Sequence, residues 1–442
     1  MKLICVFIFI CVLVFAAFAQ KPDDVLASAK GHSIRLRDLS SEVQKQVGDL
    51  PASLLKSRKE LADQMINERV LDLEAKTRGI TPGKLIADEK AKLPAPNEAA
   101  IKALYIAKQN ALGGKTLLEM RKPITDYLRN QAEQKMIGDL LTRFRVKYKV
   151  TAGKDVNAVG LASNDVIATV NALPIFAWEF EDYARIPLLD DRLDLADAIL
   201  DEVSNALYVA LIADEAKALG IDATALIGRE ITDKMKAFSD EERLALTDDL
   251  EKRLFAKYDV KIIYAAPDPI VQNISTGNSP SVGPANAPVT IVMFSDFQCS
   301  ACSATHPILK KAMDAYPGKI RFVVRNFPLE TIHVNSWRAA LAAAAANAQG
   351  KFFEYTDILY AHQDALDDAS LKKYAVDLGL NVKQFELDLN SEKTATLVLK
   401  DIADGKSYGI GGTPTVYVNG IAVRRFSVAS FKTAIGKALV NK

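Results

Sequence analysis

Cysteine is scarce in this chain, with four among 442 residues. Cys5 and Cys11 lie in an apolar amino-terminal run that we expect to be removed, which leaves only Cys299 and Cys302. Exported proteins that depend on disulfides for stability carry more cysteines, at wider and more varied spacings. The scarcity argues against a disulfide-linked scaffold, and the CxxC spacing of the remaining two indicates a reactive pair.

The amino terminus has the pattern of a secretory signal over residues 1–19. Lys2 precedes an apolar run, Leu3–Phe18, which ends in the small-x-small sequence Ala17-Phe18-Ala19. The alternative is an uncleaved membrane anchor, but the run is shorter than the ~20 residues that a spanning helix needs. We therefore expect cleavage, no membrane insertion afterwards, and a periplasmic or otherwise extracytoplasmic location.

The sequence also has no large excess of charge and few histidines. Its 56 basic and 55 acidic residues nearly cancel, which argues against a nucleic-acid partner, because such binders need clustered basic charge. Of four histidines, His306 is the one that follows the cysteine pair closely. A metallochaperone could use Cys299, Cys302 and His306, but a closed zinc site wants four ligands. We expect no metal and no cofactor, with His306 a surface or helix-kink residue.

The region before residue 265 contains an internal repeat. Val25-Leu-Ala-Ser-Ala and Val166-Ile-Ala-Thr-Val lie 141 residues apart, and the same offset aligns Glu74-Ala-Lys-Thr-Arg-Gly-Ile with Glu215-Ala-Lys-Ala-Leu-Gly-Ile. Apolar residues at three- and four-residue spacings form one helix face in each copy. Each copy is therefore predicted to have a short extended start followed by amphipathic helices.

The predicted repeats cover residues 20–150 and 151–264. Each is expected to close on a strand-like segment, Arg145–Val150 in the first repeat and Tyr258–Ile263 in the second.

This arrangement resembles the helical amino-terminal region of SurA-type periplasmic chaperones and related prolyl isomerases, over roughly residues 25–264. The gap between the repeats, about residues 151–165, is too short for a parvulin-type domain, so we predict no prolyl isomerase activity. A helical spacer or dimerisation module is the alternative to chaperone-like binding. Trp178 and Phe180 are interpreted as core anchors of the second repeat.

A proline- and glycine-rich connector follows at residues 265–288 and ends the helical pattern. Val289–Phe294 then reads as a buried strand, a helix is expected from about Cys299, and a second strand at Lys319–Val324 completes a β-α-β unit. The predicted fold is a small mixed α/β sheet over residues 289–442.

A helical insertion over about residues 330–408 is expected to interrupt this sheet. Its Ala-rich stretch from Ala339 favours a closely packed core helix. Strands resume on either side of Asn419-Gly420, a strong hairpin-turn signal, and the helix Ser430–Val440 ends the chain.

The cysteine pair lies where a strand passes into a helix, in Phe294-Ser-Asp-Phe-Gln-Cys-Ser-Ala-Cys. Cys299 would occupy the helix amino terminus, where unpaired backbone N–H groups favour a thiolate. Cys302, nearly one turn later, would be more buried and close enough to form a Cys299–Cys302 disulfide. This predicts a catalytic dithiol–disulfide cycle.

Three ordered motifs resemble the DsbA-like branch of the thioredoxin superfamily, over roughly residues 270–442. They are the segment that ends at Cys299, Gln349-Gly-Lys-Phe-Phe-Glu-Tyr, and Gly411-Gly-Thr-Pro-Thr-Val-Tyr-Val-Asn-Gly. The resemblance implies a thioredoxin fold and a cis peptide bond before Pro414, beside the cysteine pair. It also implies that the backbone of Thr413 binds an extended client segment.

Two departures from the DsbA-like pattern affect the expected chemistry. Many relatives carry a buried acid six residues before the first cysteine, whereas this chain has Met293. Ser300-Ala301 replaces the Pro-His of the strong oxidant DsbA, so we expect a milder redox poise. We also expect an exposed Asp296 that partly offsets the helix dipole.

The sequence as a whole favours an extracytoplasmic protein disulfide oxidoreductase. Its expected partners are unfolded or cysteine-containing protein clients and a redox partner protein, with a homodimer as a further prediction. The rival hypothesis is a periplasmic holdase in which the thioredoxin domain is mainly structural.

Overall fold

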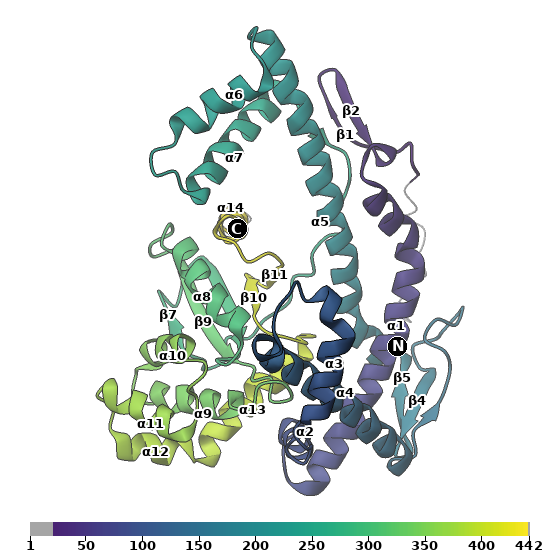
Figure 1. Ribbon diagram of the computed structural model, residues 1–442, viewed down its shortest axis with the longest axis vertical. Coiled ribbons are helices and arrows are strands. Elements are labelled where there is room, and N and C mark those ends of the chain that lie inside the picture. Colours follow the sequence, from purple (N-terminus) through teal and green to yellow (C-terminus); the bar gives the residue numbers. More distant parts are fainter. Residues whose placement is uncertain (1–20, 441–442) are drawn as a thin grey trace, which may run out of the picture. The chain divides into compact units, whose positions relative to one another are not determined.

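The computed structural model describes residues 21–440, so the predicted signal at 1–19 lies outside the described residues. Among the residues described, no helix combines the length and apolar character needed to cross a membrane. Figure 1 shows a helical amino-terminal region followed by a mixed α/β domain with a helical insertion, in agreement with the predicted fold class.

The chain forms two compact units. The first holds the described residues up to Glu60 together with Arg185–Asp268, and the second holds Leu61–Ala184 together with Pro269–Lys442. Both long helices are shared, since α1 (Ser41–Arg78) and α5 (Ala177–Ala218) each begin in one unit and end in the other.

The first unit combines the start of the first repeat with the end of the second. A hairpin of β1 (Val25–Ala29) and β2 (His32–Arg35) is completed by β6 (Lys261–Ile262), in the order β2-β1-β6. Leu26 of the hairpin is buried in one core with Val203 of α5. The other elements are the 3-10 segment Leu36–Asp38, α6 (Ala223–Glu230), the 3-10 segment Thr232–Lys234 and α7 (Asp240–Lys257).

The helical part of the second unit combines the hairpin of the second repeat with helices of the first repeat. Here β4 (Val166–Val170) and β5 (Leu173–Phe176), from the second repeat, are completed by β3 (Thr151–Ala152), in the order β3-β4-β5. The helices come from the first repeat: α2 (Pro82–Ala91), α3 (Glu98–Lys108), the 3-10 segment Gln109–Ala111 and α4 (Leu117–Lys147).

An equivalent backbone hydrogen bond joins the hairpin of one repeat to the helix end of the other in both units. In the first unit, the Lys30 N–H at the hairpin turn donates to the carbonyl of Tyr258, just after α7. In the second unit, the Asn171 N–H donates to the carbonyl of Tyr148, just after α4. Each hairpin therefore packs with the helix end of the other repeat.

Two expectations in this region are wrong. Arg145–Lys147 forms the last turn of α4, and the strand begins only at Thr151. Helix propensity and the Lys147 contact with Glu74 extend the helix through a segment whose alternation resembled a strand. Phe180 is buried as expected, but the Trp178 side chain is 54% exposed because it lies on the outer side of the first turn of α5.

The carboxyl-terminal domain is built on a five-stranded sheet of order β11-β10-β8-β9-β7. The central strands β8 and β9 are parallel, whereas β10 pairs antiparallel to β8 and β7 pairs antiparallel to β9. The strand bounds are β7 (Ser281–Val282), β8 (Val289–Ser295), β9 (Ile320–Asn326), β10 (Thr415–Val418) and β11 (Ile421–Val423).

Strand β8 is mostly apolar because both faces of the sheet are covered. Ile291 and Met293 point into the larger core, which includes α8, the insertion and α14. Val292 and Phe294 point into a smaller core on the opposite face, with Tyr417. This alternation follows from the two-residue period of a strand.

The predicted insertion is present and lies between β9 and β10 (Figure 1). The Ala-rich helix α9 is mostly buried at its centre and packs against the other insertion helices. At Asn419-Gly420 both residues have positive φ, 46° and 82°, as a tight hairpin turn requires. The helices are α8 (Ser300–Met313), α9 (Ser336–Asn347), α10 (Phe352–Ala361), α11 (Asp368–Asp377), α12 (Val382–Leu389), α13 (Glu392–Ser407) and α14 (Val428–Val440).

Candidate redox site

The cysteine pair lies at the end of β8, where the chain turns into α8. Cys299 is the N-cap residue of α8, so its sulfur lies beside the unpaired N–H groups of the first turn. Cys299 is 8% exposed and Cys302 is 0% exposed, and both are free thiols in the described structure. Both thiols are thus buried, but Cys299 keeps a slight exposure that Cys302 lacks.

The Gly-Gly-Thr-Pro loop lies directly against the first cysteine. The Thr413–Pro414 peptide bond is cis, as the resemblance to the DsbA-like branch implies. The Cys299 thiol donates to the carbonyl oxygen of Thr413 at a sulfur–oxygen distance of 3.4 Å. Strand β10 follows at once and pairs with β8 through Thr415 and Phe294, which holds the loop beside the cysteines.

Cys302 has an environment that disfavours its ionised form. Burial raises the pKa of the Cys302 thiol to about 12, against the opposing hydrogen bonds of the Asp296 backbone and the Ser295 hydroxyl. Met293 occupies the position where relatives carry an acid, and it is fully buried. No carboxyl group is therefore supplied from that position.

The expectation of an exposed Asp296 is wrong, since the residue is 1% exposed. Its carboxylate accepts hydrogen bonds from the backbone N–H groups of Gln298 at 2.7 Å and Leu329 at 2.8 Å, and it contacts Nδ1 of His333 at 2.7 Å. These donors explain how a carboxylate is tolerated inside the domain. The contacts with Leu329 and His333 join the turn before Cys299 to the loop after β9.

Two side chains from α10 and the loop that follows it complete the surroundings of the pair. Tyr360 Oη lies 2.5 Å from Ser295 Oγ. Gln363 Nε2 donates to the carbonyl oxygens of Phe297 and Cys299, at 3.0 and 2.9 Å. No sequence pattern predicts Tyr360, Gln363 or His333 at the site, because they come from distant segments without a spacing signal.

His306 lies mostly inside the domain rather than on its surface, with a side chain 13% exposed. Its ring contacts Tyr360 and Phe322, with centroid distances of 5.2 and 6.2 Å. Burial lowers the pKa of His306, which favours a neutral ring. In the described part of the chain, no group of three or more His, Cys, Asp or Glu residues is arranged to hold a metal ion.

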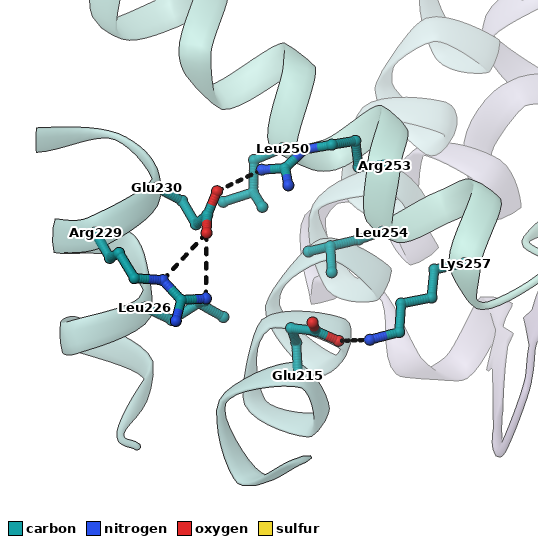
Figure 2. A pocket seen from close by; sticks show the side chains of 8 residues that line it. All are labelled: Glu215, Leu226, Arg229, Glu230, Leu250, Arg253, Leu254 and Lys257. Atoms are coloured by element: carbon teal, nitrogen blue, oxygen red, sulfur yellow. Dashed lines mark hydrogen bonds and ion pairs between the residues drawn. The ribbon is translucent and has the colours of Figure 1, made fainter. Parts of the chain in front are cut away.

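Away from the cysteine pair, a small hollow of about 70 Å³ lies among α5, α6 and α7 of the first unit (Figure 2). Its charged side chains pair with one another: Glu230 with Arg229 and Arg253, and Glu215 with Lys257. Because these charges are mutually compensated, the hollow offers no free group to a ligand, and the redox pair is the stronger candidate site.

A β-α-β unit followed by an antiparallel hairpin, a CxxC pair at the first helix and an adjacent cis-proline define a thioredoxin-like domain. The family model described as Thioredoxin matches residues 275–437. This part of the chain is a thioredoxin-like domain with a helical insertion and a CxxC-spaced cysteine pair.

Curated proteins are similar to a part of this chain. The Na(+)/H(+) antiporter NhaA 3 of Salinispora tropica is 38% identical over 138 residues, which are 31% of this chain and 21% of the antiporter. This chain thus spans about a fifth of the length of that relative.

Two solved structures are also similar to a part of this chain. A thioredoxin-like oxidoreductase from Silicibacter pomeroyi is 26% identical, with a TM-score of 0.34, over 36% of this chain and 92% of that one. Oxidised BdbD from Bacillus subtilis is 26% identical, with a TM-score of 0.36, over 39% of this chain and 100% of its own.

Proposed function

We propose that this protein is an extracytoplasmic thiol–disulfide oxidoreductase that acts on protein clients through Cys299 and Cys302. The observation that supports this most directly is the position of the Cys299 sulfur. It belongs to the N-cap residue of α8, is slightly exposed, and lies 3.4 Å from the Thr413 carbonyl oxygen, with a fully buried second thiol in the same helix.

The proposed cycle follows from the unequal exposure of the two sulfurs. In the reducing direction, the Cys299 thiolate attacks a client disulfide, forms a mixed disulfide and releases one client thiolate. Cys302 then attacks Cys299, which forms the Cys299–Cys302 disulfide and releases the second client thiolate. The oxidising direction is the reverse, and a redox partner protein restores the starting state of the pair.

The client segment is proposed to lie along the Thr413-Pro414 loop. Thr413 is half-buried and precedes β10, so its backbone lies outside the strand pairing of the sheet. Its carbonyl oxygen is also close to the reactive sulfur of Cys299. An extended peptide that paired with this backbone would present its sulfur to Cys299. Without an imidazole between the cysteines, we propose a milder oxidant than DsbA.

The helical repeats are proposed to capture unfolded clients, in line with their resemblance to SurA-type chaperones. Each hairpin already receives its third strand from within the chain, which favours capture over homodimerisation as their role. Attaching a capture module to the redox domain would raise the local concentration of client thiols.

Catalysed reduction of insulin and refolding of a reduced disulfide protein test the proposed function. Cys299→Ser is expected to abolish both activities, because it removes the attacking sulfur, and Cys302→Ser is expected to accumulate mixed disulfides with clients. Lys310→Ala, an exposed change on the same helix, serves as the control and should retain wild-type rates.

Equal rates for the wild type and Cys299→Ser would reject the enzyme and favour the holdase. The holdase hypothesis has its own measurement, suppression of client aggregation by Cys299→Ser and by residues 21–264. Absence of suppression by either would argue against client capture by the repeats.

A further inference from the structure

The turn that carries Cys299 is closed by local hydrogen bonds. The Cys299 N–H donates to the carbonyl oxygen of Asp296 at 3.2 Å, and the Gln298 N–H donates to the Asp296 carboxylate at 2.7 Å. These bonds satisfy N–H groups of the turn. The carbonyl oxygens of Phe297 and Cys299 instead bind a side chain from the helical insertion.

That side chain is Gln363, which binds both carbonyl groups through one amide. Its Nε2 donates to the carbonyl oxygen of Phe297 at 3.0 Å and to that of Cys299 at 2.9 Å. An amide nitrogen carries two hydrogens, so the two bonds form together. The Cys299 carbonyl also accepts from the Ser303 N–H at 3.1 Å, within the first turn of α8. Gln363 therefore contacts the residue that holds the reactive sulfur.

Packing of the insertion fixes the amide of Gln363. The residue is half-buried, two positions beyond the end of α10. On one side of it, the Tyr360 carbonyl accepts from the Ser303 hydroxyl at 3.1 Å. On the other side, the Ala365 carbonyl accepts from the Tyr374 hydroxyl at 2.9 Å. Both flanks of the segment are anchored, so little conformational entropy is lost when the amide is held against the turn.

The two carbonyl groups matter to the sulfur because of their charge. A carbonyl oxygen carries partial negative charge, and that of Cys299 belongs to the same residue as a sulfur that acts as a thiolate when the pair is reduced. The amide hydrogens of Gln363 offset this charge. In the disulfide the sulfur is neutral, so the same carbonyl groups repel nothing. Gln363 should therefore stabilise the reduced pair more than the oxidised pair.

We infer that Gln363 is a positioning residue of the redox site, which holds the Cys299 turn and favours the reduced form of the pair. This inference rests on the proposed function. When the Cys299 thiolate attacks a client disulfide, a bond forms between Cys299 Sγ and one client sulfur, and the electron pair of the broken S–S bond leaves on the other. Gln363 exchanges no proton or electron in this step. Its contribution is to the stability of the thiolate that begins it.

Equilibration of the full chain with glutathione tests this role, because it measures the Cys299–Cys302 pair itself. Gln363→Met keeps the length of the side chain but removes both donors. It should shift the equilibrium towards the disulfide about three- to tenfold at pH 7, the range expected for a lost hydrogen bond. Gln363→Glu should shift it further, because an ionised carboxylate adds negative charge beside both carbonyl oxygens. The difference between the two variants should shrink as the pH falls from 7 to about 4, since the carboxyl group then gains a proton.

The matched control is Gln349→Met. Gln349 is a half-buried glutamine of the same insertion, and its Nε2 donates to the carbonyl oxygen of Asn381 at 3.2 Å rather than to the Cys299 turn. The control should leave the glutathione equilibrium within about twofold of the wild type. Urea denaturation of both variants separates a loss of general stability from an effect on the pair.

A glutathione equilibrium for Gln363→Met within about twofold of the wild type, or an equal shift in Gln349→Met, would overturn the positioning role. If Gln363→Met does not fold, Gln363→Glu decides the question, because a shift that does not depend on pH would also overturn the role. The proposed function has a separate readout. A wild type that equilibrates with glutathione but neither reduces insulin nor refolds a reduced protein would overturn that function and leave the role of Gln363 standing.

Discussion

At the scale of single residues, Asp296 is the polar side chain on which the structure around the redox pair most depends. Its carboxylate joins the turn before Cys299 to the loop after β9 through Leu329 and His333. Asp296→Asn keeps the volume but replaces one acceptor oxygen with a donor, which would face donors already in place. We expect a loss of about 1–3 kcal/mol in the free energy of unfolding.

Urea denaturation measures this loss as a lower midpoint with an unchanged slope. Asp314→Asn, an exposed change at the end of α8, is the control and should alter the midpoint little. A midpoint for Asp296→Asn equal to that of the wild type would show that the three hydrogen bonds contribute nothing net.

The residues of the site differ in how far the sequence could predict them. Cys299, Cys302 and Pro414 stand in short motifs whose spacing carries the chemistry, so a local pattern is enough to find them. Tyr360 and His333 reach the site only through tertiary packing of α10 and of the loop after β9. A charged residue near a turn is usually exposed, whereas Asp296 is buried with two contacts, to Leu329 and His333, that come from outside its own segment.

At the scale of helices and strands, the helical repeats are held by a carboxylate that occurs in both copies, buried in the first and half-buried in the second. Glu74 on α1 accepts from Arg78, Lys147 and Tyr148, and so connects α1 with the end of α4. The equivalent Glu215 on α5 accepts from Lys257 and Tyr258 at the end of α7. Alignment of the repeats revealed the two glutamates, but their partners became visible only in the fold.

This contact should make stability depend on pH in a defined direction. Desolvation of Glu74 is outweighed by its hydrogen bonds to Lys147, Tyr148 and Arg78, which together lower the pKa of Glu74 to about 2 from 4.5. Because the folded-state pKa is lowered, the stabilisation is fully present above about pH 4.5 and is lost as the pH falls towards 2.

Glu74→Gln should therefore destabilise the protein by about 1–3 kcal/mol at pH 7 and by progressively less below pH 4.5. Denaturant titrations at pH 7, 4.5 and 3 measure the difference. Glu60→Gln, in an exposed pair with Lys56, should change stability by less than about 0.5 kcal/mol at every pH. A Glu74→Gln deficit that did not shrink on acidification would contradict the assignment.

At the scale of the whole molecule, the two repeats are not two successive folded bodies. Each compact unit takes its hairpin from one repeat and the end of a helix from the other, and the completing strand is the segment that follows that helix. The repeat was evident from the sequence because equivalent residues recur at one offset. The pairing of each hairpin with the other repeat was not evident from the sequence, because a hairpin has the same local pattern whichever copy it pairs with.

The exchange predicts how a single repeat would behave alone. In residues 21–150, the β1–β2 hairpin lacks β6, and the end of α4 lacks the β4–β5 hairpin. Since the repeats are alike, the hairpin of one copy can pair with the α4 end of another, in the manner of a segment-swapped dimer. Light scattering should give residues 21–150 twice the mass of one fragment, while residues 21–264, which hold both halves, should remain monomeric. A cooperatively folded monomer of residues 21–150 would show that the hairpin can close on its own repeat.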